Sequence, residues 1–318
     1  MTQPAQRPFQ ILAIDGGGFR GAYAAHVLAR MEEAHGVDWH RDFDLITGTS
    51  TGSIIASAIA CRIPIARVLN LYQQHGRSIF KKRWFSRIGL FSSRYRSDAL
   101  QQVLMDEFGN QTLGEVKKPL ILPATDIGNG CVHVFKSAYD PGFTRDQHVK
   151  VRDAILASCS APTYFDPKRV EGKDVYLLAD GGLWANNPAL VAAVDAKRRL
   201  GQPFENLRIL SIGTGDAHQF YPMSPSWWQR CLGWGFATRW GRGRFIEMLL
   251  NLQSQKDNNI LGLILNKEQI VRINFSSDRA LPLDDPSMWD TWISKAGHDF
   301  THNSDQLRQF IRKAGDPS

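Results

Sequence analysis

The most constraining feature of this sequence is a Gly-Thr-Ser-Thr-Gly pentapeptide that runs from Gly48 to Gly52. Residues 43–46 before it are apolar and predict a buried strand, and residues 53–60 after it are apolar and alanine-rich and predict a buried helix. A strand, a Gly-x-Ser-x-Gly turn and a helix are typical of a nucleophile elbow, in which the central serine projects from a sharp turn. Glycine stands on both sides because a larger residue would collide with the strand or the helix. The pattern makes Ser50 the candidate nucleophile, although an ordinary strand-to-helix turn can carry the same pentapeptide.

A second glycine-rich turn, residues 15–21, follows the first predicted strand. Its spacing fits the Gly-x-Gly-x-x-Gly fingerprint of a dinucleotide site, but that site needs an acidic residue where this chain carries the pentapeptide. Alternatively, the backbone N–H groups of Gly16, Gly17 and Gly18 form a concave surface that binds an oxyanion beside the serine. We favour the oxyanion interpretation because the turn precedes the elbow by one strand–helix unit. Arg20 is expected to hold this loop, form a structural salt bridge or contact a phosphate.

A serine nucleophile needs a base, and the best candidate is Asp180 at the end of a predicted strand, residues 175–179. Gly181 and Gly182 follow it and permit close backbone approach, although Asp-Gly-Gly also occurs in ordinary turns. An exposed aspartate is a weak base, so Asp180 can act only if it is partly desolvated and in contact with the Ser50 oxygen. None of the nine histidines lies in a recognisable catalytic frame. Those considered as alternative bases are His218, His298 and His302.

The order of predicted elements indicates an α/β fold with a mostly parallel central sheet sandwiched by helices. Predicted strands, mostly separated by helices, cover residues 9–14, 43–46, 119–125, 132–135, 175–179, 207–212 and 269–275. Ligands in such folds gather at the carboxyl ends of the strands, so the three glycine-rich turns should converge on one site. Residues 1–318 are expected to form one domain with a C-terminal helical cap region, in which residues 216–265 are a cap or regulatory segment.

The charge balance suits an anionic partner. The chain has 38 Lys and Arg against 31 Asp and Glu, a formal charge of +7, which fits a membrane surface, a phosphorylated ligand or nucleic acid. The four cysteines are far apart without a Cys-x-x-Cys pair, which favours a reducing compartment over a zinc site or a disulfide framework. The N-terminal residues are polar, and no segment approaches the ~20 apolar residues of a membrane span. We expect a cytoplasmic protein that touches the membrane only from its surface.

The three turns together resemble the patatin-like phospholipases over nearly the whole chain. Residues 15–21 look like the oxyanion loop of that family, residues 48–52 like its nucleophile elbow and residues 180–182 like its base motif. Further similar segments are residues 160–165, 184–188 and 211–215. The family's elbow is usually followed by another glycine, where this chain has Ser53. The resemblance implies a patatin-like fold, a serine–aspartate dyad without histidine, and hydrolysis of lipid acyl esters through an acyl-enzyme, with no required metal or cofactor.

Two stretches that mix cations with aromatic rings, residues 80–85 and 227–245, suggest regulation. They suit a packed cap, contact with a membrane interface, or a pocket in which cations bind phosphates and rings stack on bases. The candidate ligand or membrane contacts are Lys81, Lys82, Arg83, Trp84, Arg239, Trp240, Arg242 and Arg244. The overall pattern is similar to the bacterial antiphage (CBASS-type) patatin-like effectors. That similarity implies activation by a cyclic dinucleotide and action at the inner membrane, with no polymeric nucleic acid as partner. The sequence does not predict the oligomeric state.

Two other functions remain open from the sequence. A constitutive esterase or lysophospholipase would use a Ser-His-Asp triad. However, only one strand precedes the strand that leads into the elbow, which disfavours the strand order of an α/β-hydrolase. A nucleotide-binding module would use the first glycine-rich turn instead. Release of fatty acid from a phospholipid, with and without nucleotide, separates these alternatives.

Overall fold

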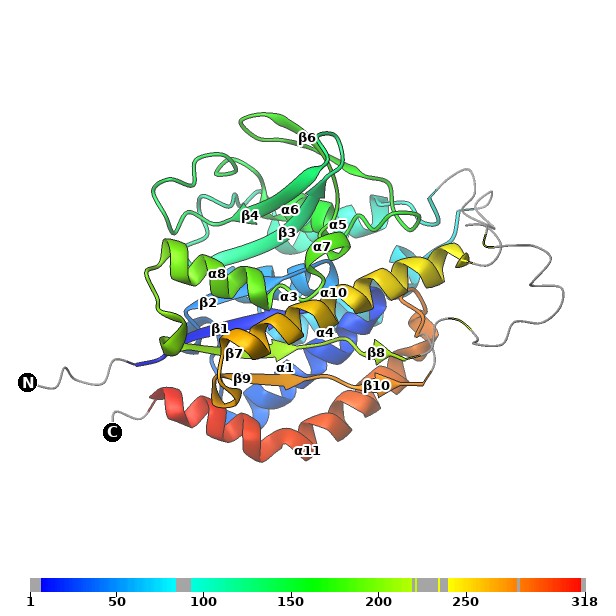
Figure 1. The fold of residues 1–318 in the computed structure, drawn as a ribbon. Helices are drawn as coiled ribbons and strands as arrows, with labels where there is room; N and C mark the ends of the chain where they lie inside the picture. The colour runs from blue at the N-terminus through cyan, green and yellow to red at the C-terminus, as the bar shows by residue number, and fades with distance from the viewer. Residues whose placement is uncertain are drawn as a thin grey trace, which may run out of the picture.

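A mixed eight-stranded sheet with helices on both faces forms the centre of the molecule (Figure 1). The structure is a computed structural model that describes residues 7–83, 93–218, 221, 234, 240–278 and 281–315. Within these ranges, the side chains of residues 242 and 312–315 are outside the description. No helix in the described ranges is both long and apolar enough to cross a bilayer.

The elements have the following bounds. The strands are β1 (Phe9–Ile14), β2 (Leu45–Gly48), β3 (Leu120–Asp126), β4 (Cys131–Lys136), β5 (Lys168–Glu171), β6 (Val175–Asp180), β7 (Leu207–Ile212), β8 (Asp216–Ala217), β9 (Ile270–Ile273) and β10 (Ser276–Ser277). The helices are α1 (Gly21–His35), α2 (Trp39–Asp42), α3 (Thr51–Ala60), α4 (Ile65–Ile79), α5 (Asp98–Phe108), α6 (Val151–Ser158), α7 (Gly182–Ala185), α8 (Ala189–Arg199), α10 (Arg242–Ile264) and α11 (Trp289–Gly315).

Alternate residues of β1 point to opposite faces of the sheet and build two separate cores. Ile11 and Ala13 pack with apolar residues of α8 and α10. Leu12 and Ile14 pack with those of α1, α3, α4 and α11. A parallel strand that is buried on both faces reads as a continuous apolar run, which is what the sequence of β1 shows. The two cores hold the sheet between layers of helices. The sheet in turn positions the loops at the carboxyl ends of its strands.

The sheet has the strand order β5-β6-β3-β2-β1-β7-β9, and the two edges of β3 determine where the candidate base lies. Residues 121–126 pair antiparallel with β4 on one edge. On the other edge, Ile121 pairs in parallel with Thr47 of β2, and Ala124 pairs antiparallel with Asp180 of β6. Strands β2 and β6 therefore run head to head along one edge of β3, with their carboxyl ends facing each other.

The expected α/β fold with a mostly parallel central sheet is confirmed, because parallel pairings join β1, β2, β3, β7 and β9. Strand β6, which carries Asp180 at its carboxyl end, runs antiparallel to β3. The carboxyl ends of β2 and β6 still converge, since they approach from opposite directions. The second strand lies at residues 45–48 rather than 43–46, and β5 was not expected.

Candidate active site

Ser50 lies on a strained turn between β2 and α3. Its backbone angles are φ 52° and ψ −124°, a combination that non-glycine residues rarely adopt and that clusters at functional sites. A Cβ on Gly48 would overlap the backbone of Gly52, and a Cβ on Gly52 would overlap the carbonyl of Ile14. Both glycines are therefore needed for this turn. The serine borders a cavity and stands at the N-terminus of α3, where the helix dipole favours negative charge.

Asp180 is the carboxyl group that meets this serine. It is only 2% exposed, it lines the same cavity as Ser50, and its interaction with the Ser50 side chain lowers its pKa. The Gly182 N–H donates to Oδ1 of Asp180 at 2.7 Å, and Gly181 begins the turn into α7. The Thr125 hydroxyl donates to the Asp180 carbonyl at 2.8 Å. Burial raises the pKa of Asp180 to about 7, against the smaller lowering effects of the Gly182 and Ser50 hydrogen bonds. Such a group is a stronger proton acceptor than an exposed aspartate.

The first glycine-rich turn presents two free backbone donors. Among the described residues, the N–H groups of Gly17 and Gly18 have no hydrogen-bond partner, and both residues line the cavity with Ser50. The Gly16 N–H differs from expectation because it donates to the carbonyl of Asn186 at 3.0 Å, which leaves it unavailable to an oxyanion. Nε of the buried Arg20 donates to the Gly17 carbonyl at 3.3 Å, so this arginine holds the loop. Burial is also the main cause that lowers the pKa of Arg20.

A narrow cavity of about 60 Å³ joins the serine, the carboxyl group and the two glycines. Aliphatic and aromatic side chains form most of the remaining wall, including Phe19, Ile54, Leu71, Tyr72, Phe80, Tyr164, Phe165, Leu250 and Leu283. All nine histidines belong to the described part of the chain, and none of them lines this cavity. Across the same described ranges, no group of three or more His, Cys, Asp or Glu residues could hold a metal ion. The arrangement suits an ester that carries a hydrocarbon chain.

A buried polar network supports the glycine turn from behind. Arg272 of β9 forms an ion pair with Asp15 at 2.7 Å. Ser254 of α10 donates to Asp15 at 3.1 Å and accepts a hydrogen bond from Asn186 at 2.9 Å. Sequence reasoning missed Arg272 and Ser254, because nothing in their local sequence marks them. Asn186 could have been found, since it lies in residues 184–188, one of the segments similar to the family.

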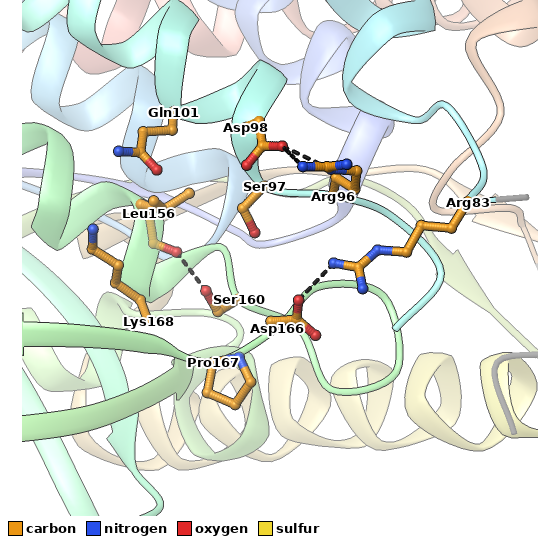
Figure 2. A pocket seen from close by; sticks show the side chains of 10 residues that line it. All are labelled: Arg83, Arg96, Ser97, Asp98, Gln101, Leu156, Ser160, Asp166, Pro167 and Lys168. Carbon is orange, nitrogen blue, oxygen red and sulfur yellow. Dashed lines mark hydrogen bonds and ion pairs between the residues drawn. The ribbon is translucent and has the colours of Figure 1, made fainter. Parts of the chain in front are cut away.

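The first basic stretch borders a separate pocket of about 680 Å³ (Figure 2). Arg83 lines this pocket and pairs with Asp166 at 2.6 Å, and Arg96 lines it and pairs with Asp98 at 2.7 Å (Figure 2). An anionic ligand here would therefore have to compete with carboxylates. The other expected contacts of this stretch are the exposed Lys81 and Lys82, and Trp84, which lies outside the described residues.

The second basic stretch leads into α10. The ring of Trp240 lies 5.0 Å from that of Trp234 and 5.3 Å from that of Phe245. The Arg244 guanidinium lies over the ring of Tyr221 at 5.6 Å. These rings and this cation form an aromatic cluster at the start of the helix that contributes Leu250 to the cavity wall. The expected contacts outside the description are Arg239 and the side chain of Arg242.

Comparison with known proteins identifies the family. The family model described as patatin-like phospholipase matches residues 12–193, more than half of the chain. The chain belongs to the patatin-like phospholipases. The matched region contains Gly17, Gly18, Ser50 and Asp180, which line the cavity together. The family resemblance expected from the sequence is thereby confirmed.

Bacterial members of the family are similar over much of the chain. A cGAMP-activated phospholipase of Pseudomonas aeruginosa is 36% identical over 210 residues, which cover 65% of this chain and 62% of that protein. A cUMP-AMP-activated phospholipase of Escherichia coli is 29% identical over 320 residues, which cover 95% of this chain and 93% of that one. The crystal structure of VipD from Legionella pneumophila shares the fold with a TM-score of 0.52 at 12% identity, over 98% of this chain and 68% of VipD. The similarity to cyclic-dinucleotide-activated relatives agrees with the expected bacterial subgroup.

Proposed function

We propose that this patatin-like phospholipase hydrolyses acyl esters of membrane glycerophospholipids through Ser50 and Asp180. The observation that supports it most is that a serine on a strained turn and a buried carboxyl group, whose pKa is raised to about 7, line the same cavity. The apolar wall of the cavity suits the hydrocarbon part of a lipid.

In the proposed reaction, the Ser50 oxygen attacks the ester carbonyl while its proton passes to Asp180. The N–H groups of Gly17 and Gly18 donate to the oxyanion that forms. The carbon–oxygen bond to the lysophospholipid breaks, and Asp180 gives its proton to that leaving alcohol, which leaves the acyl group on Ser50. A water then loses its proton to Asp180 and attacks the acyl-enzyme. Asp180 returns this proton to the Ser50 oxygen as the ester bond to Ser50 breaks, which releases the fatty acid and regenerates the serine.

The test is release of fatty acid from phospholipid vesicles by the wild type and by Ser50→Ala. We expect Ser50→Ala to melt like the wild type, to release no fatty acid and to resist labelling by a fluorophosphonate probe. Single replacement of His218, His298 or His302 by alanine should leave turnover unchanged. Retained turnover in Ser50→Ala would overturn the proposal, and loss of turnover in a folded histidine variant would favour the triad.

We further propose that a cyclic dinucleotide activates the enzyme at the inner-membrane surface, in bacterial antiphage defence. The names of the relatives support a nucleotide activator. The cavity supports a closed resting state, because about 60 Å³ is far below the roughly 300–1,000 Å³ of typical ligand pockets. The basic and aromatic residues near Arg83 and Trp240 supply groups that phosphates and bases prefer.

This activation is tested by titrating purified protein with a panel of cyclic dinucleotides that includes cGAMP and cUMP-AMP, with phospholipid vesicles as substrate. We expect at least one of them to raise turnover in the wild type and none to do so in Ser50→Ala. Full activity without nucleotide, or no response to the whole panel, would refute the switch and leave the lipase proposal intact.

A further inference from the structure

The last residue of α6 contacts Ser50, and the segment that follows α6 contacts Asp180. The Ser50 N–H donates to Oγ of Ser158 at 3.0 Å, and the Asp180 N–H donates to the carbonyl of Ser160 at 2.9 Å. Ser158 is the last residue of α6, and Ser160 begins the segment 160–165 that resembles the family. One short turn of chain therefore holds the backbones of the nucleophile and the base.

The hydroxyl of Ser158 has only one orientation available. It is fully buried and donates its single proton to the carbonyl of Pro123 in β3 at 2.7 Å. A hydroxyl that has donated its proton can only accept, so a lone pair of Oγ faces the Ser50 N–H. Because no solvent reaches Ser158, water cannot substitute for either bond.

These bonds connect the elbow to the strand that carries the base. Pro123 precedes Ala124, and Ala124 pairs directly with Asp180. Ser50 is thus linked through Ser158 to the part of β3 that pairs with Asp180 and fixes its position along the strand. The link also holds Ser50 at φ 52°, a strained conformation that persists only where neighbouring groups enforce it.

We propose that Ser158 is a positioning residue that fixes the direction of the Ser50 nucleophile relative to Asp180. This inference rests on the proposed role of the Ser50–Asp180 pair. Ser160 contributes through its backbone alone, because its hydroxyl turns back to the carbonyl of Leu156 at 2.8 Å (Figure 2).

The chain offers a matched control in Ser137. This serine is equally buried, and its hydroxyl accepts from the Leu120 N–H at 2.9 Å and donates to the Lys118 carbonyl at 2.7 Å. It makes the same pair of bonds as Ser158, but between the start of β3 and the end of β4, and it does not line the cavity. Each serine makes one buried and one part-buried hydrogen bond, and loss of either hydroxyl leaves an N–H and a carbonyl without this partner, so both variants should lose similar stability.

The experiment compares Ser158→Ala, Ser158→Thr, Ser137→Ala and Ser50→Ala under the condition in which the wild type is most active. We expect Ser158→Ala to lower kcat by about 10²-fold, the scale of a misplaced reacting group, with KM and the midpoint of the pH–rate profile unchanged. Ser158→Thr keeps the hydroxyl and should recover much of kcat, and Ser137→Ala should turn over like the wild type.

The rate of fluorophosphonate labelling at low temperature gives a second measure of nucleophile alignment, should Ser158→Ala be poorly stable. Wild-type kcat in Ser158→Ala, or equal losses of kcat in Ser158→Ala and Ser137→Ala, would overturn the positioning role. Turnover in Ser50→Ala would instead overturn the proposed function on which it rests, so the two failures are distinguishable.

Discussion

At the scale of single residues, the burial of Asp180 has opposite consequences for chemistry and for stability. Its pKa is about 7 in the folded protein and 3.8 when exposed. Between these values the folded state holds a proton that the unfolded state lacks, so the free energy of unfolding falls as the pH rises through this window. Above it, the protein keeps a buried carboxylate that favours catalysis and disfavours the fold.

The pH dependence of turnover should report this carboxyl group. We expect kcat/KM for a soluble ester to rise with pH through a midpoint near 7, because Asp180 accepts the Ser50 proton only when ionised. Initial rates across the pH range measure it. A midpoint near ~4 would show an exposed aspartate instead.

Replacing the carboxyl group should separate stability from activity. Asp180→Asn can still accept from the Gly182 N–H but carries no charge. At about pH 8 we expect its melting temperature to exceed that of the wild type by about 2 °C or more, while hydrolysis is abolished. The gain should shrink towards pH ~5, where the wild-type carboxyl group is protonated. Thermal unfolding at both pH values checks this, and a variant that melts lower than the wild type at the higher pH would contradict it.

Substitution of Gly17 tests the proposed oxyanion-binding role of the two free backbone N–H groups. A Cβ at this position would overlap the side chain of Thr214, so Gly17→Ala should displace the loop. We expect kcat to fall roughly 10²–10³-fold with little change in KM, as for loss of one oxyanion donor. Gly262→Ala on α10 is the control, because a Cβ there meets no atom within 4 Å. A rise in KM at constant kcat would assign Gly17 to substrate binding instead.

At the scale of elements, the sequence predicted those strands and turns that a local residue pattern specifies. The apolar run of β1 and the glycines around Ser50 specify a buried strand and a sharp turn, and the structure has both. Strand direction has no local signature, so the antiparallel course of β6 could not be read from residues 175–180. Strand β5 has the sequence Lys-Arg-Val-Glu, which lacks an apolar run, because an edge strand with one buried residue needs none.

The site could be predicted only where its residues are adjacent to a motif. Ser50, Asp180 and the glycine turn stand in recognisable patterns. Arg272 and Ser254 reach Asp15 from β9 and α10, and such contacts between distant segments depend on the folded sheet. The same holds for Ser158, whose two hydrogen bonds span three elements.

The ion pair between β9 and the glycine turn should be important for stability. Asp15 is 2% and the Arg272 side chain 15% exposed, so Arg272→Met would leave a buried carboxylate without its partner. We expect a loss of about 3–5 kcal/mol in the free energy of unfolding, measured by chemical denaturation. Adding Asp15→Asn should recover part of that loss. If Arg272→Met alone were as stable as the wild type, Asp15 would be adequately solvated without Arg272.

At the scale of the whole molecule, residues 216–265 remain the predicted cap or regulatory segment of a single domain. Helix α10 from this segment supplies Leu250 to the cavity wall and Ser254 to the network behind the glycine turn. A movement of α10 would therefore change both the size of the cavity and the support of the turn.

The net charge of +7 predicts salt-sensitive binding to anionic membranes. We expect the protein to sediment with vesicles rich in phosphatidylglycerol at low salt, to dissociate as salt is raised, and to bind phosphatidylcholine vesicles weakly. Ser50→Ala serves as the test protein, because it leaves the lipid intact. Equal binding to both vesicle types at all salt concentrations would indicate insertion of apolar residues rather than charge attraction.

The head-to-head meeting of β2 and β6 also affects events during synthesis. Ser50 leaves the ribosome well before Asp180, and β2 and β6 do not pair with each other, although both pair with β3. The strand and turn that carry Ser50 are therefore synthesised while Asp180, the proposed proton acceptor, is still untranslated. The proposed nucleophile and base can therefore meet only after β6 has been synthesised and has paired with β3.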